Sequence, residues 1–210
     1  MGISDTVSKI QFKPSYYYEV VQFGVTKSAD LAAISAAIKS NLLAIFEVKV
    51  QPNGSFQTPD YYAIFEHTSP DSSFGKVIAD HKVVSFAHTT VLSVGEQIEI
   101  SLRYDKYYEF FTAWVNDGKQ EYMQKFFDTS QPIKERYGRP APLFLVQFQP
   151  ATETDDEVYF TPSLGGLVEW DDYSDVEVLL NNEEFKEKAA PLFGEAISRI
   201  EMIIGKVIIL

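Results

Sequence analysis

The sequence contains no cysteine, which excludes disulfides, thiolate nucleophiles, iron–sulfur clusters and cysteine-based zinc sites. It contains no run of about 18 apolar residues, so we expect no membrane span. Its first twelve residues also lack the apolar segment of a secretory signal peptide. Positive charge is scarce, because 18 Lys and Arg stand against 30 Asp and Glu, a formal net charge of −12. Phosphate backbones need basic surfaces, so we expect a cytoplasmic protein that binds neither membranes nor nucleic acids.

Hydrophobic residues make up 45% of the 210 positions and aromatic residues 14%, enough to fill a sizeable core and to exclude a disordered chain. Charge is uneven along the chain. Residues 1–104 carry ten acidic and eight basic residues, a net of −2, whereas residues 105–210 carry twenty and ten, a net of −10. At roughly 100–200 residues per domain, we predict two units, residues 1–100 and 101–210, with the breakpoint near 95–105.

Hydrophobic periodicity in the first half predicts alternating strands and helices. One stripe, formed by Leu31, Ile34, Ile38 and Leu42, is typical of an amphipathic helix. Aromatic and β-branched segments predict the strands. The expected elements are a strand at 15–25, a helix at 27–43, strands at 44–50 and 61–67, a helix from 69 to about 87 and a strand at 89–94.

The second half predicts the same order. Asn181-Asn182 should interrupt its last helical region, and Pro191 should kink that region or begin a new turn because it lacks an N–H donor. The expected elements are strands at 107–115, 142–149, 164–170 and 200–209, and helices at 119–137, from 174, and at 183–198, with an acidic insertion at 150–163.

Both halves therefore follow the order β-α-β-β-α-β, that of a ferredoxin-like unit. The strands are apolar on both faces: in one of them Tyr107, Phe111 and Ala113 alternate with Tyr108, Phe110 and Trp114. A face of several hundred Å² left in water would forfeit on the order of 10 kcal/mol. We therefore predict an α+β fold of two tandem ferredoxin-like repeats packed sheet to sheet, as a pseudo-dimeric monomer or a homodimer.

Four motifs of the second half add a family resemblance. They are Glu135-Arg136-Tyr137-Gly138-Arg139, Leu167-Val168-Glu169-Trp170, Leu180-Asn181-Asn182-Glu183-Glu184-Phe185 and Ile203-Ile204-Gly205. In order and spacing they resemble a small uncharacterised half-barrel family, related to NIPSNAP and EthD proteins, of the dimeric α+β barrel superfamily. Arg139 stands where that family has a second glycine, and Phe193 about where it often has an arginine. The resemblance implies sheets that pair into a barrel.

That superfamily includes cofactor-free monooxygenases, small isomerases, polyketide cyclases, haem enzymes and proteins of no known activity, so the fold alone does not fix a function. The resemblance implies that cyclases and isomerases of this architecture use a His or Tyr in the pocket between the sheet and the helices. His67 and His88 fall near predicted strand ends and are candidate acid/base residues, the alternative being histidines that face solvent or are bonded internally. His81 is expected on the surface. The resemblance to two-repeat haem enzymes implies an axial histidine in the C-terminal unit, but residues 105–210 contain no histidine, and no motif supports a tyrosine ligand in its place.

Aromatic clusters supply candidate pocket residues. Tyr17, Tyr62, Tyr108 and Trp114 are predicted to line an apolar space under the helices, with plain core packing as the alternative. The acidic groups Asp155-Asp156-Glu157 and Asp171-Asp172 lack calcium-loop spacing, and we predict no metal and no cofactor.

Two functions stay open. The first is a protein without catalytic machinery that binds a small apolar or aromatic molecule. The second is a cofactor-independent monooxygenase or polyketide cyclase/isomerase, in which His67 or His88 moves a proton together with a Tyr hydroxyl. An imidazole close to a Tyr hydroxyl or a carboxylate in a closed pocket would favour the second function.

Overall fold

The computed structural model describes residues 7–26, 34, 36, 39, 41–53, 57–69, 74–136, 144–147 and 164–209. Eight described strands form one sheet in the order β5-β2-β4-β3-β10-β7-β9-β8, and every neighbouring pair is antiparallel. The strands are β2 (Tyr17–Val25), β3 (Leu42–Asn53), β4 (Tyr61–His67), β5 (Val84–Leu92), β7 (Tyr107–Val115), β8 (Phe144–Gln147), β9 (Leu164–Trp170) and β10 (Ile197–Ile209).

The sheet order contains the ferredoxin-like arrangement twice. Strands β5-β2-β4-β3 form the first unit, residues 17–92, and strands β10-β7-β9-β8 form the second unit, residues 107–209. In each unit the fourth strand in chain order lies beside the first, followed by the third and the second. The two sheets join where β3 pairs with β10. The predicted α+β fold of two ferredoxin-like units is therefore confirmed.

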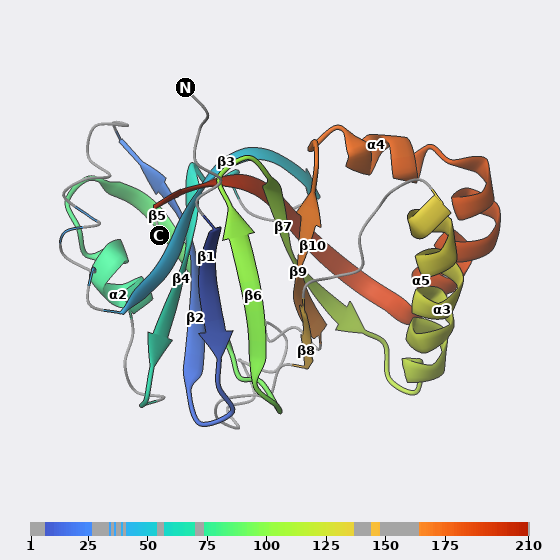
Figure 1. Cartoon of the computed structure of the whole chain (residues 1–210), viewed down its shortest axis with the longest axis horizontal. Helices are drawn as coiled ribbons and strands as arrows, with labels where there is room; N and C mark the ends of the chain where they lie inside the picture. Colours follow the sequence, from blue (N-terminus) through green and yellow to red (C-terminus); the bar gives the residue numbers. More distant parts are fainter. Residues whose placement is uncertain are drawn as a thin grey trace.

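Helices lie at both ends of this sheet (Figure 1). The first unit carries α2 (Phe74–Ala79), and the second carries α3 (Gln120–Arg136), α4 (Asp175–Leu180), the π-helical turn η2 (Phe185–Ala189) and α5 (Ala190–Ala196). Pro191 stands in the first turn of α5, where its missing N–H costs no hydrogen bond. The expected new turn at Pro191 is thus confirmed, and the break at Asn181-Asn182 falls just after α4.

The helix expected to reach residue 87 is shorter than predicted. It ends at Ala79, and β5 begins at Val84, so His88 lies inside a strand rather than before one. The β-branched run at Val83 and Val84 favours extended backbone. Other expectations lie outside the described residues: most of the helix at 27–43, the ends of the strand at 142–149, the acidic insertion at 150–163, and the motif residues Tyr137, Gly138 and Arg139.

A two-stranded ribbon, β1 (Val7–Phe12) paired with β6 (Ile98–Arg103), was not predicted. Both strands alternate apolar with polar residues, as half-buried strands do. Ile10 and Ile100 are buried and paired, whereas Lys9 and Glu99 are exposed and form a 2.7 Å ion pair. The predicted breakpoint near 95–105 therefore contains a strand.

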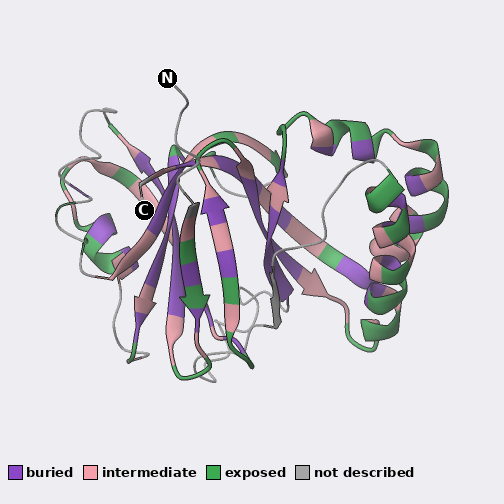
Figure 2. Cartoon of the chain, in the orientation of Figure 1, coloured by how far each residue is buried: buried purple, intermediate pink, exposed green. Residues whose placement is uncertain are grey.

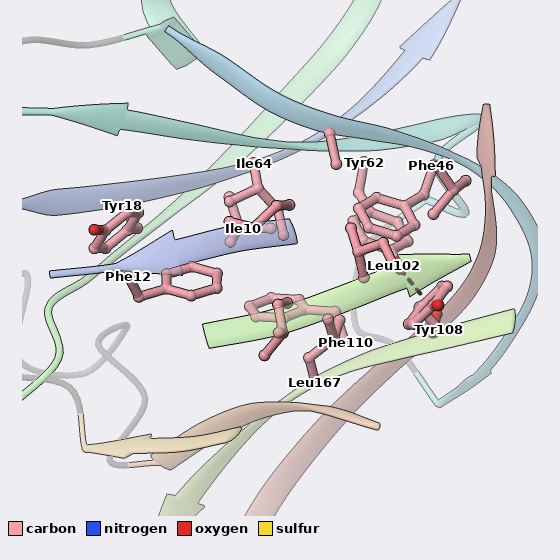
Figure 3. Packing of buried hydrophobic residues seen from close by; sticks show 14 of the residues in the cluster. Ile10, Phe12, Tyr18, Phe46, Tyr62, Ile64, Leu102, Tyr108, Phe110 and Leu167 are labelled. Carbon is pink, nitrogen blue, oxygen red and sulfur yellow. Dashed lines mark hydrogen bonds between the residues drawn. The ribbon is translucent and has the colours of Figure 1, made fainter. Parts of the chain in front are cut away.

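The inner face of the sheet encloses one hydrophobic core shared by both units and the ribbon (Figure 3). Phe46 and Tyr62 of the first unit stack with ring centroids 4.3 Å apart, and the Tyr62 hydroxyl donates to the Tyr108 carbonyl of the second unit at 2.8 Å. Burial is greatest along these central strands (Figure 2). Sheet-to-sheet packing is thus confirmed within a single chain. The core comprises Ile10, Phe12, Tyr18, Val20, Ala44, Phe46, Tyr62, Ile64, Leu92, Val94, Ile100, Leu102, Tyr108, Phe110, Leu167, Ile203 and Val207.

Candidate functional site

A cavity of about 210 Å³ lies between the outer face of the second unit's sheet and its helices. Strands β7, β9 and β10 supply its floor, and α3, α4, η2 and α5 supply its cover. Most of the lining is aliphatic or aromatic, and its charged members are Glu109 and Lys134. The lining residues are Glu109, Phe111, Met123, Phe126, Phe127, Lys134, Val168, Trp170, Val176, Leu179, Leu180, Phe185, Ala190, Phe193, Ile200 and Met202.

Glu109 is a buried carboxylate on β7, with 7% of its surface exposed. Its Oε2 accepts a hydrogen bond of 2.9 Å from the indole Nε1 of Trp170 on the paired strand β9. Burial raises the pKa of Glu109 because the charged form loses solvation, while the Trp170 hydrogen bond and the charge of Lys134 act in the opposite direction. A carboxyl group of this kind can hold or release a proton closer to neutral pH than an exposed one.

Lys134 approaches the same cavity from the last turn of α3. Burial lowers the pKa of its ammonium group, whereas the charge of Glu109 raises it. The ammonium nitrogen also lies 5.9 Å from the centre of the Phe126 ring, within the range of a cation–π contact. The cavity therefore carries one acidic and one basic group in otherwise apolar surroundings.

The cavity reaches the surface at α4. Leu180 lines it and is 45% exposed, whereas Leu179 and Phe185 are buried deeper. The π-helical turn η2 presents Phe185 to the cavity, and the Asn182 side chain accepts the Phe185 amide at 2.9 Å. Single π-helical turns occur often at functional sites, and this one supplies an aromatic residue of the lining.

His67 and Tyr17, two of the predicted site residues, lie together in the first unit. Their rings are stacked with centroids 5.9 Å apart. His67 is buried, and its Nδ1 lies 2.5 Å from the Ser69 carbonyl oxygen. The close partner of this imidazole is thus a backbone carbonyl. Neither residue lines the cavity of the second unit, and their role in catalysis or binding stays a prediction.

His88 and Trp114 belong to one group of side chains on the inner face of the sheet, and Arg199 and Glu201 connect them. The Arg199 guanidinium stacks 4.5 Å above the Trp114 ring and pairs with Glu201. His88 is half-buried, and burial lowers its pKa, with Glu201 raising it and Arg199 lowering it. This polar group is separate from the cavity, since none of its members lines it.

Tyr62 and Tyr108 point into the shared core rather than toward the cavity (Figure 3). The Tyr108 hydroxyl accepts the Arg103 amide at 2.7 Å and donates to Glu169 at 3.0 Å. Burial raises the pKa of both phenols. Each hydroxyl therefore already has a protein partner, and the ligand-binding role predicted for these tyrosines stays a prediction.

Sequence reasoning did not single out Glu109 or Lys134. The signal available was the position of Glu109 between Tyr107 and Phe111, on one face of an otherwise apolar strand. A carboxylate in such a place must be either bonded or functional, because an unpaired buried charge is costly. Lys134 gave no signal, since its position at a helix end is typical of a solvated residue.

Glu109→Gln should change how stability depends on pH. The folded-state pKa of Glu109 is raised, so its contribution to stability is full below the unfolded pKa and is lost as pH rises through the folded value. Glutamine stays neutral and can still accept the Trp170 indole. We expect the variant to gain stability relative to the wild type between pH 4 and pH 7.5 in urea unfolding. An equal difference at both pH values would contradict the buried state of this carboxyl.

Within the described ranges, no three His, Cys, Asp or Glu side chains come together in a way that could hold a metal ion. No described helix is long and apolar enough to span a membrane.

The sequence matches no family model and no curated protein, but solved structures share its architecture. An anthrone oxidase-like protein superposes with a TM-score of 0.55 at 9% identity, covering 96% of this chain and 94% of that one. A proposed monooxygenase from Fusobacterium nucleatum subsp. nucleatum gives 0.53 at 10% identity, with 92% of each chain covered. A mutant chlorite dismutase from Candidatus Nitrospira defluvii gives 0.51 at 8%, covering 93% and 92%.

Identities this low establish the fold alone. The chain has the fold of the dimeric α+β barrel proteins, with both ferredoxin-like halves of the barrel present in one polypeptide.

Proposed function

We propose that this protein binds a small, largely apolar molecule of one or two rings in the cavity of the second unit. The observation that supports the proposal is an apolar space of about 210 Å³, open at α4, with Glu109 in its floor and Lys134 in its cover. An engineered apolar cavity of about 150 Å³ binds benzene, and drug-sized ligands occupy about 300–1,000 Å³. The size thus favours a compact aromatic ligand.

A second candidate is a cofactor-independent monooxygenase or a cyclase/isomerase acting on such a molecule. It is favoured by the likeness to an anthrone oxidase-like protein and to a proposed monooxygenase. As predicted from the sequence, this second function would assign the proton transfer to His67 or His88. Neither residue lines the cavity. Both candidates require a pocket for a small molecule, and they differ in whether the bound molecule reacts.

Several finer expectations accompany this proposal. We propose that the chain divides near residue 100 into two repeats and works as a pseudo-dimeric monomer, with a homodimer as the alternative. Matching tyrosine contacts support the duplication: Tyr18 accepts the Lys13 amide at 2.5 Å, as Tyr108 accepts that of Arg103. Kinship with NIPSNAP and EthD proteins and a cytoplasmic location stay predictions.

Filling the cavity tests the binding site. Val168 is buried in the cavity wall directly opposite Glu109 on the paired strand, and Val168→Phe places a ring in the ligand's space. At ten times its Kd, 2-methoxynaphthalene should stabilise the wild type by about 1.4 kcal/mol, or about 4 °C in Tm for a chain of this size. We expect Val168→Phe to remove most of that shift in a thermal-shift assay.

The matched control is Val77→Phe. Val77 is 49% exposed on α2, so the same exchange there should leave the ligand-induced shift unchanged. A shift of equal size in both variants, or none in the wild type at saturating probe, would disprove the proposed site.

A further inference from the structure

We propose that Glu109 is a catalytic proton acceptor for a compact aromatic or enolisable ligand, taking a proton from a weakly acidic O–H or C–H group beside Lys134. This inference rests on the proposed function, because it assigns chemistry to the same cavity. It names the substrate class as a one- or two-ring phenol, or a ketone with an acidic C–H.

The position of the Glu109 carboxylate supports this role. Glu109 lines an apolar cavity, and Oε2 is held by the Trp170 indole at 2.9 Å. An ionised carboxylate has about four acceptor positions, and the indole occupies one. Among the described residues, no second hydrogen-bond donor to Glu109 is seen. A ligand donor in the cavity would thus find free acceptor capacity in water-poor surroundings.

Glu19 holds the corresponding place in the first unit, and its contacts differ from those of Glu109. Both glutamates follow a Tyr-Tyr pair at the start of the unit's first strand. Glu19 accepts the Phe74 and Gly75 amides at 2.7 and 2.8 Å, so it binds the first turn of α2. In the second unit Glu109 accepts the Trp170 indole, no described backbone amide donates to it, and its side chain lines the cavity.

Atoms and charges balance during the proposed proton transfer. The O–H or C–H bond of the ligand breaks, a new O–H bond forms on the Glu109 carboxylate, and the electron pair stays on the ligand as a phenolate or enolate. The total charge does not change, and no oxidant is needed. Glu109 and Lys134 are the charged groups of the lining, so the negative charge moves from Glu109 to a ligand in the cavity that Lys134 also lines.

Hydrogen–deuterium exchange of 2-tetralone in D₂O tests this step, because exchange at its acidic carbon requires proton removal. We expect the wild type to accelerate the exchange seen by NMR, and Glu109→Gln to reduce that acceleration by about 100-fold, the usual scale for general-base catalysis. Glu169→Gln is the matched control. Glu169 lies on β9, next to Trp170, and accepts the Tyr108 hydroxyl on the opposite face of the sheet, so its variant should keep the wild-type rate.

Binding of 2-methoxynaphthalene, which has no acidic proton, separates the two proposals. If it binds the wild type and Glu109→Gln alike while only the wild type promotes exchange, both proposals are supported. If it binds but Glu109→Gln exchanges 2-tetralone as fast as the wild type, or the wild type gives no acceleration, the proton-acceptor role is overturned and the binding site stands. If it does not bind, the site itself is disproved.

A wild-type pH profile covers the case in which Glu109→Gln fails to fold. The exchange rate should rise with pH through one ionisation displaced above the ordinary range of a glutamate carboxyl. A rate that is flat above pH 5 would overturn the assignment.

Discussion

Phe46→Ala is expected to destabilise the protein by about 3–5 kcal/mol, the usual cost of removing a fully buried aromatic ring. Phe46 has no exposed surface, stacks on Tyr62 at 4.3 Å and meets the Tyr108 ring edge-on at 5.7 Å. It therefore contacts residues of both units. The melting temperature should fall by about 10 °C in calorimetry, since 1 kcal/mol shifts Tm by about 2–4 °C at this size.

The loss should appear as one cooperative transition. If the inner face of the sheet encloses a single core, removal of the Phe46 ring should destabilise both units together. Val77→Ala, at a half-exposed position of α2, should change stability by no more than about 0.5 kcal/mol. Two separate transitions in Phe46→Ala, or a cost near that of the surface control, would contradict the shared core.

The shared core explains why the fold could be predicted from the sequence. Strands such as β7 are apolar on both faces, and both faces are buried only if another layer of the protein covers each side. This requirement can be seen in the residues of each strand, without knowing which residues far apart in sequence contact one another. The ribbon was not predicted, although Ile10 and Phe12 alternate with Lys9 and Gln11. Its two six-residue strands are far apart in sequence and become stable only when they pair with each other and pack on the shared core.

The candidate site could be predicted only in part. Apolar space under the helices followed from the excess of aromatic residues, but its position depends on how α3, η2 and α5 pack, which is a tertiary outcome. The predicted Tyr108 and the missed Glu109 are neighbours in sequence, and strand alternation places them on opposite faces. If the inward and outward positions of the strand are assigned one residue out of step, a tyrosine of the core is taken for a cavity residue and the carboxylate of the cavity is missed.

His67 and His88 were predicted as acid/base residues because the unperturbed pKa of histidine lies near neutrality. A buried glutamate can approach the same range once burial raises its pKa, and burial is not visible in the sequence. Residue type alone thus favoured His67 and His88, whereas the environment favours Glu109 as the acid–base group of the cavity.

Gly205→Ala should cost about 2 kcal/mol, within the range of overpacking in a filled core. Gly205 pairs with Tyr108 on β7 and with Val48 on β3, where the two units join. A Cβ at this position would lie 2.8 Å from Tyr62 Cε1 and 2.9 Å from the Glu47 carbonyl oxygen. The second of these is backbone of the neighbouring strand, so β3 and β10 would have to move apart. Urea unfolding measures the loss.

Gly194→Ala provides a control of opposite sign. Nothing lies within 4 Å of a Cβ at Gly194, which stands inside α5, and alanine there should stabilise the helix by about 0.5–1 kcal/mol. If both substitutions had the same effect, the close approach at Gly205 would not limit stability. Stability changes of opposite sign would show that glycine is required where the two units join. There the missing side chain lets Tyr62 of one unit reach the backbone of the other.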